Sequence, residues 1–252
     1  MITPEGDYIS DTNSADLRSH FKYLHWRVMG HSQGHLVASD WADDDETGPY
    51  AFYKNCGLWT RDEASILLKT ASAVGGEWVD IGAHTGWTSK HINWGTNREV
   101  VCVDPMLKEP LFAQRFWGNT GFPGAWAMGM TADQFFEAAK PAHADNAYTW
   151  RGFCIDGDHE PGEPLKDAKN ALKHLAPSGV IIFHDAIGRP VREAVTFLLD
   201  QGFKARLYVT PHMVMTCWRG EFDIPTHTPD PRGDWAPHLR EIKKDFDMGR
   251  LS

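Results

Sequence analysis

The segment 153–160, FCIDGDHE, places three acids and a histidine directly after a short apolar run. Such a run is typical of a buried strand, so the charged residues stand where the strand ends. Carboxylate oxygens hold hard divalent cations, and an imidazole, which titrates at about pH 6.5, accepts protons near neutral pH. The pattern predicts a site in which Asp156 holds a cation and His159 acts as a general base, unless His159 merely begins the next helix. Asp158 and Glu160 are expected to face solvent or to cap that helix.

Three other apolar runs also end in acid. They are residues 77–82 (EWVDIG), 99–105 (EVVCVDP) and 179–186 (GVIIFHDA). In a parallel sheet the carboxyl ends of the strands share one edge, and ligands bind beyond it. We therefore expect one acidic rim formed by Asp80, Asp104, Asp156 and Asp185. Asp156 and Asp185 are predicted to hold one divalent cation, with His184 either as a further ligand or as a buried, hydrogen-bonded histidine.

The turn after the first of these runs, VDIGAHTG, carries two glycines, Gly82 and Gly86. A dinucleotide-binding turn needs glycines at its first, third and sixth positions, and His84 and Trp87 occupy the third and sixth. NAD binding is therefore disfavoured. The spacing fits the acid-x-Gly-x-x-x-Gly turn typical of class I S-adenosylmethionine-dependent methyltransferases. Asp104 at the next strand end is predicted to accept hydrogen bonds from ribose hydroxyls, with helix capping as the alternative.

The apolar runs alternate with segments of helical periodicity. Strands are expected at 77–82, 99–105, 125–130, 152–158 and 179–186, and helices at 60–74, 131–140, 164–177 and 191–202. This alternation is typical of βαβ units with a parallel sheet. Two further strand-like runs, 203–210 and 212–219, break the alternation and predict an antiparallel hairpin at the edge. The predicted fold class is α/β, with a doubly wound, mostly parallel, seven-stranded Rossmann-like sheet.

Composition limits the choice of partner. The 252 residues carry a formal charge of −9, which disfavours nucleic acid or an anionic membrane as the main partner. None of the four cysteines forms a CxxC pair, so a reducing compartment is expected. Neither a signal peptide nor a membrane-spanning run is visible. We expect a cytoplasmic protein that binds a small molecule.

Five segments together resemble the small-molecule O-methyltransferases typified by macrocin O-methyltransferase. They are VDIGAHTG, VVCVDP, FCIDGDHE, LAPSGVIIFHD and VREAVTFLLDQGF, within residues 58–220. The resemblance implies transfer of a methyl group from S-adenosylmethionine to a hydroxyl of a sugar or other natural product. It also implies, for metal-dependent members, a divalent cation such as Mg²⁺.

The resemblance assigns cofactor contacts to particular positions. The glycine turn would pass the methionine part of S-adenosylmethionine, Asp104 would hold the ribose, and Met130 with Thr131 would flank the adenine. The implied cofactor-binding residues are Asp80, Gly82, Ala83, His84, Gly86, Asp104, Met130, Thr131 and Asp156.

The resemblance also implies a metal site and a base. Asp156 and Asp185 match positions that bind the cation in metal-dependent relatives, and His159 matches the base of some sugar O-methyltransferases. Ala186 stands where catechol-type relatives have a metal-binding Asn, and His184 stands where some sugar-modifying relatives have an acid. Imidazole suits Mg²⁺ poorly, so metal dependence stays open.

Three regions are expected along the chain. Residues 1–57 form an N-terminal extension that caps the acceptor, residues 58–220 form the methyltransferase domain, and residues 221–252 form a tail. The partner is a small-molecule hydroxyl acceptor, and the aromatic N-terminal region could pack on a second copy to give a homo-oligomer. The histidines His25, His31 and His35 are assigned to the surface or to loops, and Trp41, Trp59 and Trp87 could wall an acceptor pocket.

Two other functions stay open. One is a hydroxylase-like relative, because proteins of the cephalosporin hydroxylase type share this sheet and similar acidic strand ends. The other is a non-catalytic module that binds the nucleotide for regulation or assembly.

Overall fold

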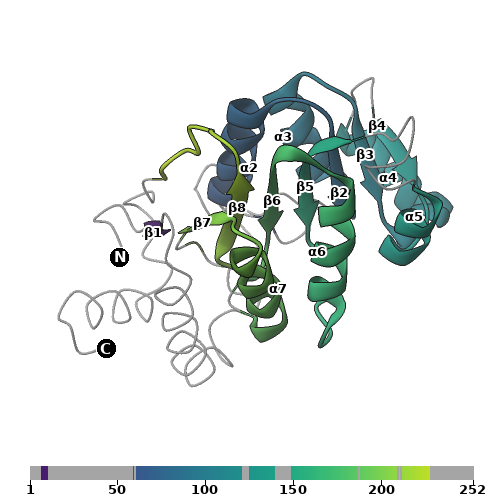
Figure 1. Cartoon of the computed structure of the whole chain (residues 1–252). Helices are drawn as coiled ribbons and strands as arrows, with labels where there is room; N and C mark the ends of the chain where they lie inside the picture. Colours follow the sequence, from purple (N-terminus) through teal and green to yellow (C-terminus); the bar gives the residue numbers. More distant parts are fainter. Residues whose placement is uncertain are drawn as a thin grey trace, which may run out of the picture.

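Short strands of mainly apolar residues form the central sheet (Figure 1). The computed structural model describes residues 7–10, 59, 61–120, 125–139, 149–186, 188–208, 210 and 212–227. The strands are β1 (Asp7–Ser10), β2 (Trp78–Ile81), β3 (Val100–Val103), β4 (Ala125–Met128), β5 (Trp150–Ile155), β6 (Leu175–Phe183), β7 (Lys204–Tyr208) and β8 (Val214–Arg219). Strands β2 to β8 confirm the predicted seven-stranded sheet, in the order β7-β8-β6-β5-β2-β3-β4.

The two ends of the sheet differ in strand direction. Strand β8 lies between β6 and β7 and runs antiparallel to both, which confirms the predicted hairpin. Strand β1 pairs antiparallel with β7 and adds an eighth strand beyond it. Sequence reasoning assigns residues 1–57 to a cap and predicts no strand there, because four residues are too few for a periodicity. The rest of that segment, with its histidines and Trp41, lies outside the described residues.

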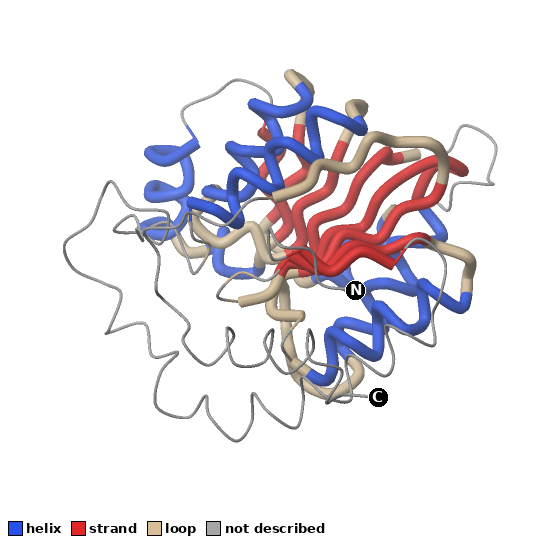
Figure 2. Tube along the Cα trace, turned by 90° about the vertical axis from the view of Figure 1, so that its left-hand side faces the viewer, coloured by secondary structure: helices blue, strands red, loops and turns tan. Residues whose placement is uncertain are grey.

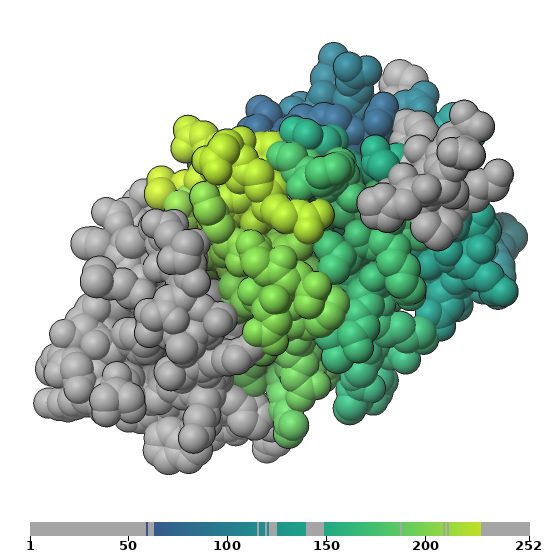
Figure 3. Space-filling model, in the orientation of Figure 1, coloured from purple at the N-terminus to yellow at the C-terminus, as the bar shows by residue number. Residues whose placement is uncertain are grey.

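Helices cover both faces of the sheet (Figure 2). On one face lie α2 (Arg61–Val74), α3 (Trp87–Thr96) and α4 (Pro110–Thr120), which share a hydrophobic core with Trp78, Cys102 and Cys154. On the other lie α5 (Ala132–Ala138), α6 (Glu163–His174) and α7 (Arg189–Asp200), over a second core. Figure 3 shows α6 and α7, in green, forming a continuous surface over this second face. A sheet buried on both faces explains why its strands read as continuous apolar runs.

One close contact in the sheet depends on the absence of a side chain. Gly152 of β5 is in register with Trp78 of β2, whose indole is fully buried. A Cβ added to Gly152 would lie 2.2 Å from atoms of the Trp78 ring. The indole is further held by its Nε1, which donates a hydrogen bond to the Gly75 carbonyl at 3.1 Å. Glycine at position 152 therefore makes room for the largest buried side chain of the neighbouring strand.

Two boundaries differ from those that the sequence indicates. The helix expected at 164–177 ends at His174, and β6 begins at Leu175. Leu175 pairs with Trp150, but Val180 pairs with Gly152, so the intervening residues of β6 form a bulge. The residues between the expected helix and the expected strand thus form an irregular start of β6, because a local sequence pattern does not reveal a bulge.

The segment 105–120, for which no element is predicted from the sequence, contains two helices. A short 3-10 helix, η2 (Pro105–Lys108), is capped by Asp104, and α4 starts at Pro110. Proline is favoured at the first position of a helix, where its missing N–H is not needed. Leu111 and Trp117 of α4 are exposed, which hides the apolar periodicity that usually reveals a helix.

The beginning of the expected tail lies against the sheet. Tyr208 of β7 donates a hydrogen bond to the Pro225 carbonyl at 2.6 Å, and Arg206 donates to the Ile224 carbonyl. The helix expected near Leu239 lies outside the described residues. Within the described part of the chain, no helix is both long and apolar enough to cross a membrane.

Replacing Gly152 by alanine tests the contact with Trp78. The added methyl group must displace a buried ring, so Gly152→Ala is expected to destabilise the protein by about 1–3 kcal/mol or more. The matched change Gly118→Ala, in α4 where nothing lies within 4 Å of the new Cβ, is expected to stabilise it by about 0.5–1 kcal/mol. Urea unfolding measures both, and effects of the same sign would contradict this account of the sheet.

Candidate functional site

A pocket of about 590 Å³ opens at the carboxyl ends of the parallel strands. Its walls come from the turn after β2, the end of β3, the start of α5, the loop after β5 and the end of β6. This is the edge at which doubly wound sheets bind ligands. The acidic rim predicted from the strand ends is thus in one place, although its four acids have different environments.

The glycine turn packs tightly against its neighbours. Gly82 has a φ of 82°, and a Cβ there would lie 2.1 Å from the Asp156 carbonyl oxygen. Gly86 has a φ of 83°, and a Cβ there would lie 2.4 Å from Thr120 of α4. At each of the two positions, only glycine tolerates both the positive φ and the lack of space for a Cβ atom. Gly82, Ala83 and His84 line the pocket, whereas Gly86 instead lets α3 approach α4.

Asp80 lies under this turn and does not line the pocket. Its carboxylate is fully buried, and Oδ2 accepts hydrogen bonds from the hydroxyls of Thr88 at 2.6 Å and Ser89 at 2.5 Å. Burial raises the pKa of Asp80 to about 6, although these hydrogen bonds act in the opposite direction. Asp80 therefore fastens the first turn of α3 to β2, and a direct contact with a ligand in the pocket is not available to it.

Asp104 both caps a helix and faces the pocket. Its Oδ1 accepts a hydrogen bond from the Met106 N–H at 2.8 Å, and its Oδ2 accepts one from the His84 N–H at 2.9 Å. The capping alternative is correct for the local structure. Each carboxylate oxygen has two lone pairs, so Asp104 can accept further hydrogen bonds from a ligand. It also holds the glycine turn in place.

The start of α5 differs from the prediction in one residue. Thr131 lines the pocket and forms a capping box with Gln134. Met130, predicted to flank the same ligand, does not line the pocket and packs against the core of the α5–α7 face. Asp133 lines the pocket in its place, and its Oδ2 lies 2.5 Å from Nζ of Lys166.

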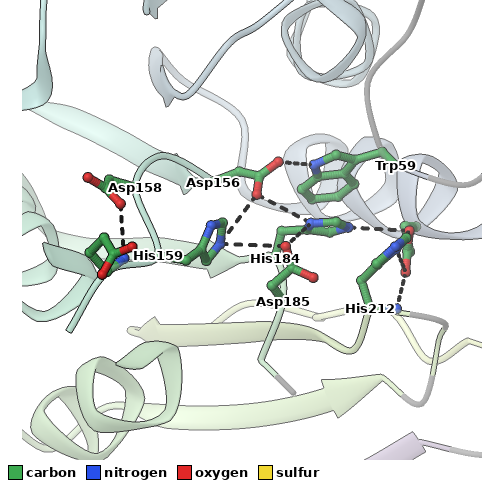
Figure 4. A network of polar contacts seen from close by, with 9 residues as sticks. Trp59, Asp156, Asp158, His159, His184, Asp185 and His212 are labelled. Carbon is green, nitrogen blue, oxygen red and sulfur yellow. Dashed lines mark hydrogen bonds and ion pairs between the residues drawn. The ribbon is translucent and has the colours of Figure 1, made fainter. Parts of the chain in front are cut away.

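Four side chains at the ends of β5 and β6 alternate as acid and imidazole (Figure 4). His184 Nδ1 lies 3.3 Å from Asp156 Oδ1 and 3.3 Å from Asp185 Oδ2. His159 Nε2 lies 3.7 Å and 3.6 Å from the same two oxygens. We call Asp156, His159, His184 and Asp185 the acid–imidazole ring. His184 is fully buried, whereas His159 is about one-third exposed and lines the pocket.

The position of His159 argues against the interpretation in which it begins the next helix. Helix α6 begins at Glu163 after Gly162, so His159 lies in the preceding loop and is not part of the helix start. Within the same loop, the Asp158 carboxylate accepts a hydrogen bond from the Glu160 N–H at 2.9 Å. This bond stabilises the loop, and the His159 side chain points toward Asp156 and Asp185.

Residues far away in the sequence support the ring from behind. Trp59 Nε1 donates a hydrogen bond to Asp156 Oδ2 at 2.6 Å, and its indole stacks on His184 with ring centroids 4.4 Å apart. Glu63 Oε2 lies 3.4 Å from His184 Nε2. Oε1 of Glu63 accepts a hydrogen bond from the His212 N–H at 2.9 Å. His184 is therefore held at Nε2 by Glu63 and on one face by Trp59.

The charges of this group depend on one another. Burial alone would lower the pKa of His184, but the carboxylates of Asp156 and Asp185 hold it well above its ordinary value. Burial would raise the pKa of Asp185, but His184 lowers it to about 2. Glu63 is fully buried, and the pKa of its carboxyl lies well below its ordinary value because His212 and His184 outweigh burial. The carboxylates are thus stabilised as anions by the imidazoles between them.

The donor atoms fit a divalent cation. Asp156, His184 and Asp185 each offer one ligand atom, and these atoms lie within 4.8 Å of one another. Two ligands at right angles on bonds of about 2.1 Å are about 3 Å apart, close to the 3.3 Å seen here. The buried Nδ1 of His184 has no well-aligned hydrogen bond to either carboxylate, so an ion that displaces its proton can bind there.

Sequence reasoning missed several residues of the site. They are Glu63, His212 and Asp167, and no pattern in the sequence linked them to the site. Asp167 of α6 lines the pocket although it is almost fully buried, and burial with nearby Glu163 raises its pKa to about 7. The proposed pocket tryptophans Trp59 and Trp87 do line the pocket.

Comparison with known families matches residues 79–186 to the model of a methyltransferase domain. The matched segment runs from β2 to the end of β6 and contains the glycine turn and the whole acid–imidazole ring. Glu63 and His212 lie outside it. No curated protein matches the chain by sequence.

Solved structures resemble the fold at low sequence identity. The cofactor-bound protein Rv0187 from MTB has a TM-score of 0.53 and 14% identity, and the match covers 83% of this chain and 98% of that one. An O-methyltransferase from Bacillus cereus in complex with S-adenosylhomocysteine has a TM-score of 0.51 and 14% identity, covering 79% and 91%. A protein of Streptococcus mutans has a TM-score of 0.50 and 16% identity, covering 65% of this chain and 51% of that one, so the chain spans about half its length. These likenesses establish a Rossmann-like methyltransferase fold.

The raised pKa of Asp80 predicts a pH dependence of stability. Folding favours the protonated carboxyl, so its contribution is fully present below about pH 4 and is lost as the pH rises through about 6. Relative to Asp80→Asn, the wild-type free energy of unfolding should fall by about 3 kcal/mol between about pH 3 and about pH 7. Urea unfolding of both proteins across this range measures the difference. The exposed Asp223→Asn serves as control, and parallel curves for wild type and Asp80→Asn would contradict the assignment.

Proposed function

We propose that this protein is an S-adenosylmethionine-dependent O-methyltransferase that acts on a hydroxyl of a small molecule such as a sugar or natural product, with the help of a divalent cation. The observation that carries the proposal is the convergence of two groups on one pocket. The glycine turn and Asp104 form one side of it, and the acid–imidazole ring forms the other. Its volume, about 590 Å³, is within the range of small-molecule sites.

The cofactor side of the pocket suits an adenosyl group. Gly82 and Ala83 offer a backbone surface with almost no side chain, along which the methionine part can lie. Asp104 keeps lone pairs for two ribose hydroxyls. Thr131 and Asp133 stand where the adenine would end. Bound S-adenosylmethionine supplies the electrophilic methyl group, and the matched domain and the O-methyltransferase of similar fold support this choice of cofactor.

The other side of the pocket suits an alcohol that must lose its proton. An alkyl hydroxyl is a weak nucleophile at neutral pH, so it needs a base close by. His159 is accessible from the pocket, and its Nε2 faces two carboxylates that stabilise the positive charge gained with the proton. Asp156 and Asp185, with His184, would hold the cation, which lowers the pKa of a bound hydroxyl. Positioning of the reactants then supplies much of the remaining rate increase.

Substituting His159 tests its role as a base. His159→Ala is expected to lower turnover by about 10²–10⁴-fold, while the affinity for S-adenosylmethionine stays within about twofold. Formation of S-adenosylhomocysteine in the presence of a panel of hydroxylated acceptors measures turnover, and calorimetry measures affinity. Glu160→Ala, an exposed neighbour that does not line the pocket, should change neither. Unchanged turnover in His159→Ala would remove the base assignment.

Substituting Asp104 tests the cofactor side. Asp104→Ala loses acceptors for two hydroxyls, and a hydrogen bond to a charged group contributes about 1.5–3 kcal/mol, so the dissociation constant for S-adenosylhomocysteine should rise at least tenfold. Equilibrium binding to full-length protein measures it, with a thermal melt as a check on folding and Glu109→Ala as an exposed control. Unaltered affinity would count against the proposed orientation. Absence of binding to the wild type would favour a hydroxylase-like or other relative with a different ligand.

A further inference from the structure

We propose that Glu63 orients His184 as a metal ligand, and that the resulting site prefers a first-row transition-metal ion to Mg²⁺. The inference rests on the proposed function for the place of the ion beside the acceptor hydroxyl, and it deepens that proposal by naming the class of ion. Its basis is the group of Asp156, His184 and Asp185 together with the buried residues behind them.

The orientation of His184 leaves one nitrogen for an ion. The ring is fully buried, and its Nδ1 points between Asp156 Oδ1 and Asp185 Oδ2, 3.3 Å from each, without a well-aligned hydrogen bond to either. A buried polar atom without such a partner is uncommon in proteins and suggests a missing ligand. Three donor atoms spaced in this way can occupy adjacent positions around one ion.

Glu63 determines which nitrogen is available. Its Oε2 lies 3.4 Å from His184 Nε2, at the far side of the imidazole from the two aspartates. The glutamate is itself fixed, because Oε1 accepts the His212 N–H at 2.9 Å and Oε2 lies 3.1 Å from His212 Nδ1. When a metal displaces the proton from Nδ1, the carboxylate at Nε2 holds the remaining ring proton on that nitrogen. Metal-binding histidines usually have such an acceptor on the second nitrogen.

Trp59 restricts both the imidazole of His184 and the carboxylate of Asp156. Its indole stacks on His184 with an interplanar angle of 17°, which restricts rotation of the imidazole. Its Nε1 donates to Asp156 Oδ2 at 2.6 Å, so Asp156 presents Oδ1 to the same point as His184. The ligands are therefore oriented before an ion arrives.

The chemistry of the ligands selects the ion. Mg²⁺ prefers sites made of oxygen atoms and keeps several waters, whereas imidazole suits later first-row metals. Two carboxylates with one buried imidazole should bind Mn²⁺, Co²⁺ or Zn²⁺ more tightly than Mg²⁺. The Mg²⁺ expected from the family resemblance thus gives way, in this proposal, to a transition-metal ion because of His184.

Calorimetric titration of chelator-treated, full-length protein with Mn²⁺ and with Mg²⁺ tests the choice of ion. The dissociation constant for Mn²⁺ should be at least tenfold lower than that for Mg²⁺. His184→Asn, which offers an oxygen in place of Nδ1, should reduce this ratio to near unity. Equal or tighter binding of Mg²⁺ by the wild type would overturn the proposal, and so would an undiminished ratio in the variant.

Glu63→Gln tests the positioning role. The variant keeps the shape of the side chain, and loss of its charge should weaken Mn²⁺ binding about 10–100-fold. Because Mg²⁺ gains less from imidazole, its affinity should change less, which a general loss of structure would not produce. Glu109→Gln, at an exposed acid that does not line the pocket, is the matched control and should leave both affinities within about twofold. Unchanged Mn²⁺ binding in Glu63→Gln would overturn the role of Glu63.

Binding of S-adenosylhomocysteine to the same samples separates the two proposals. If the protein binds S-adenosylhomocysteine but no ion, the metal inference is overturned while the methyltransferase proposal stands without a cation. If it binds Mn²⁺ selectively but not S-adenosylhomocysteine, the choice of ion is supported and the proposed cofactor is wrong.

Discussion

Repulsion among carboxylates is the constraint around which this site is organised. Parallel strands bring Asp156 and Asp185 to one edge of the sheet. Two neighbouring carboxylate anions destabilise the fold unless positive charge lies between them. His184 occupies that position, 3.3 Å from each carboxylate, and Glu63 behind it is a third buried acid. The imidazole is therefore both the counter-charge of the site and a ready ligand, so that a proton and a metal ion compete for one atom.

The same edge joins this charged group to a neutral binding surface. Gly82 approaches the backbone of Asp156 so closely that no side chain fits, and the turn that passes the pocket is thereby packed against the strand that carries the ring. Asp104 fastens that turn from the other strand through the His84 N–H. The residues proposed to contact the cofactor and the acid–imidazole ring thus lie at or directly after neighbouring strand ends, and the sheet sets the distance between them.

Much of this arrangement is local and could be predicted from the sequence. The alternation of apolar runs with helical segments predicted the mostly parallel sheet. Acids at four strand ends predicted where the site lies, because the carboxyl ends of parallel strands meet at one edge. Glu63 and His212 could not be predicted, since they meet His184 only through the packing of α2 and of the loop before β8. The prediction that Met130 contacts the ligand was wrong for a similar reason. The residue lies in the expected turn, but its side chain packs against the core, and Asp133 lines the pocket instead. Strand β1 has only four residues and helix α4 carries exposed apolar side chains, so neither has a clear periodic sequence pattern.

The account depends on donor and acceptor meeting in the pocket between the glycine turn and the acid–imidazole ring. A crystal structure of the full chain with S-adenosylhomocysteine tests this most directly. It should show the ribose hydroxyls on Asp104, the homocysteine along residues 82–84, and the sulfur facing His159 and Asp156. Density for the ligand at another place, or a ribose that makes no contact with Asp104, would contradict it.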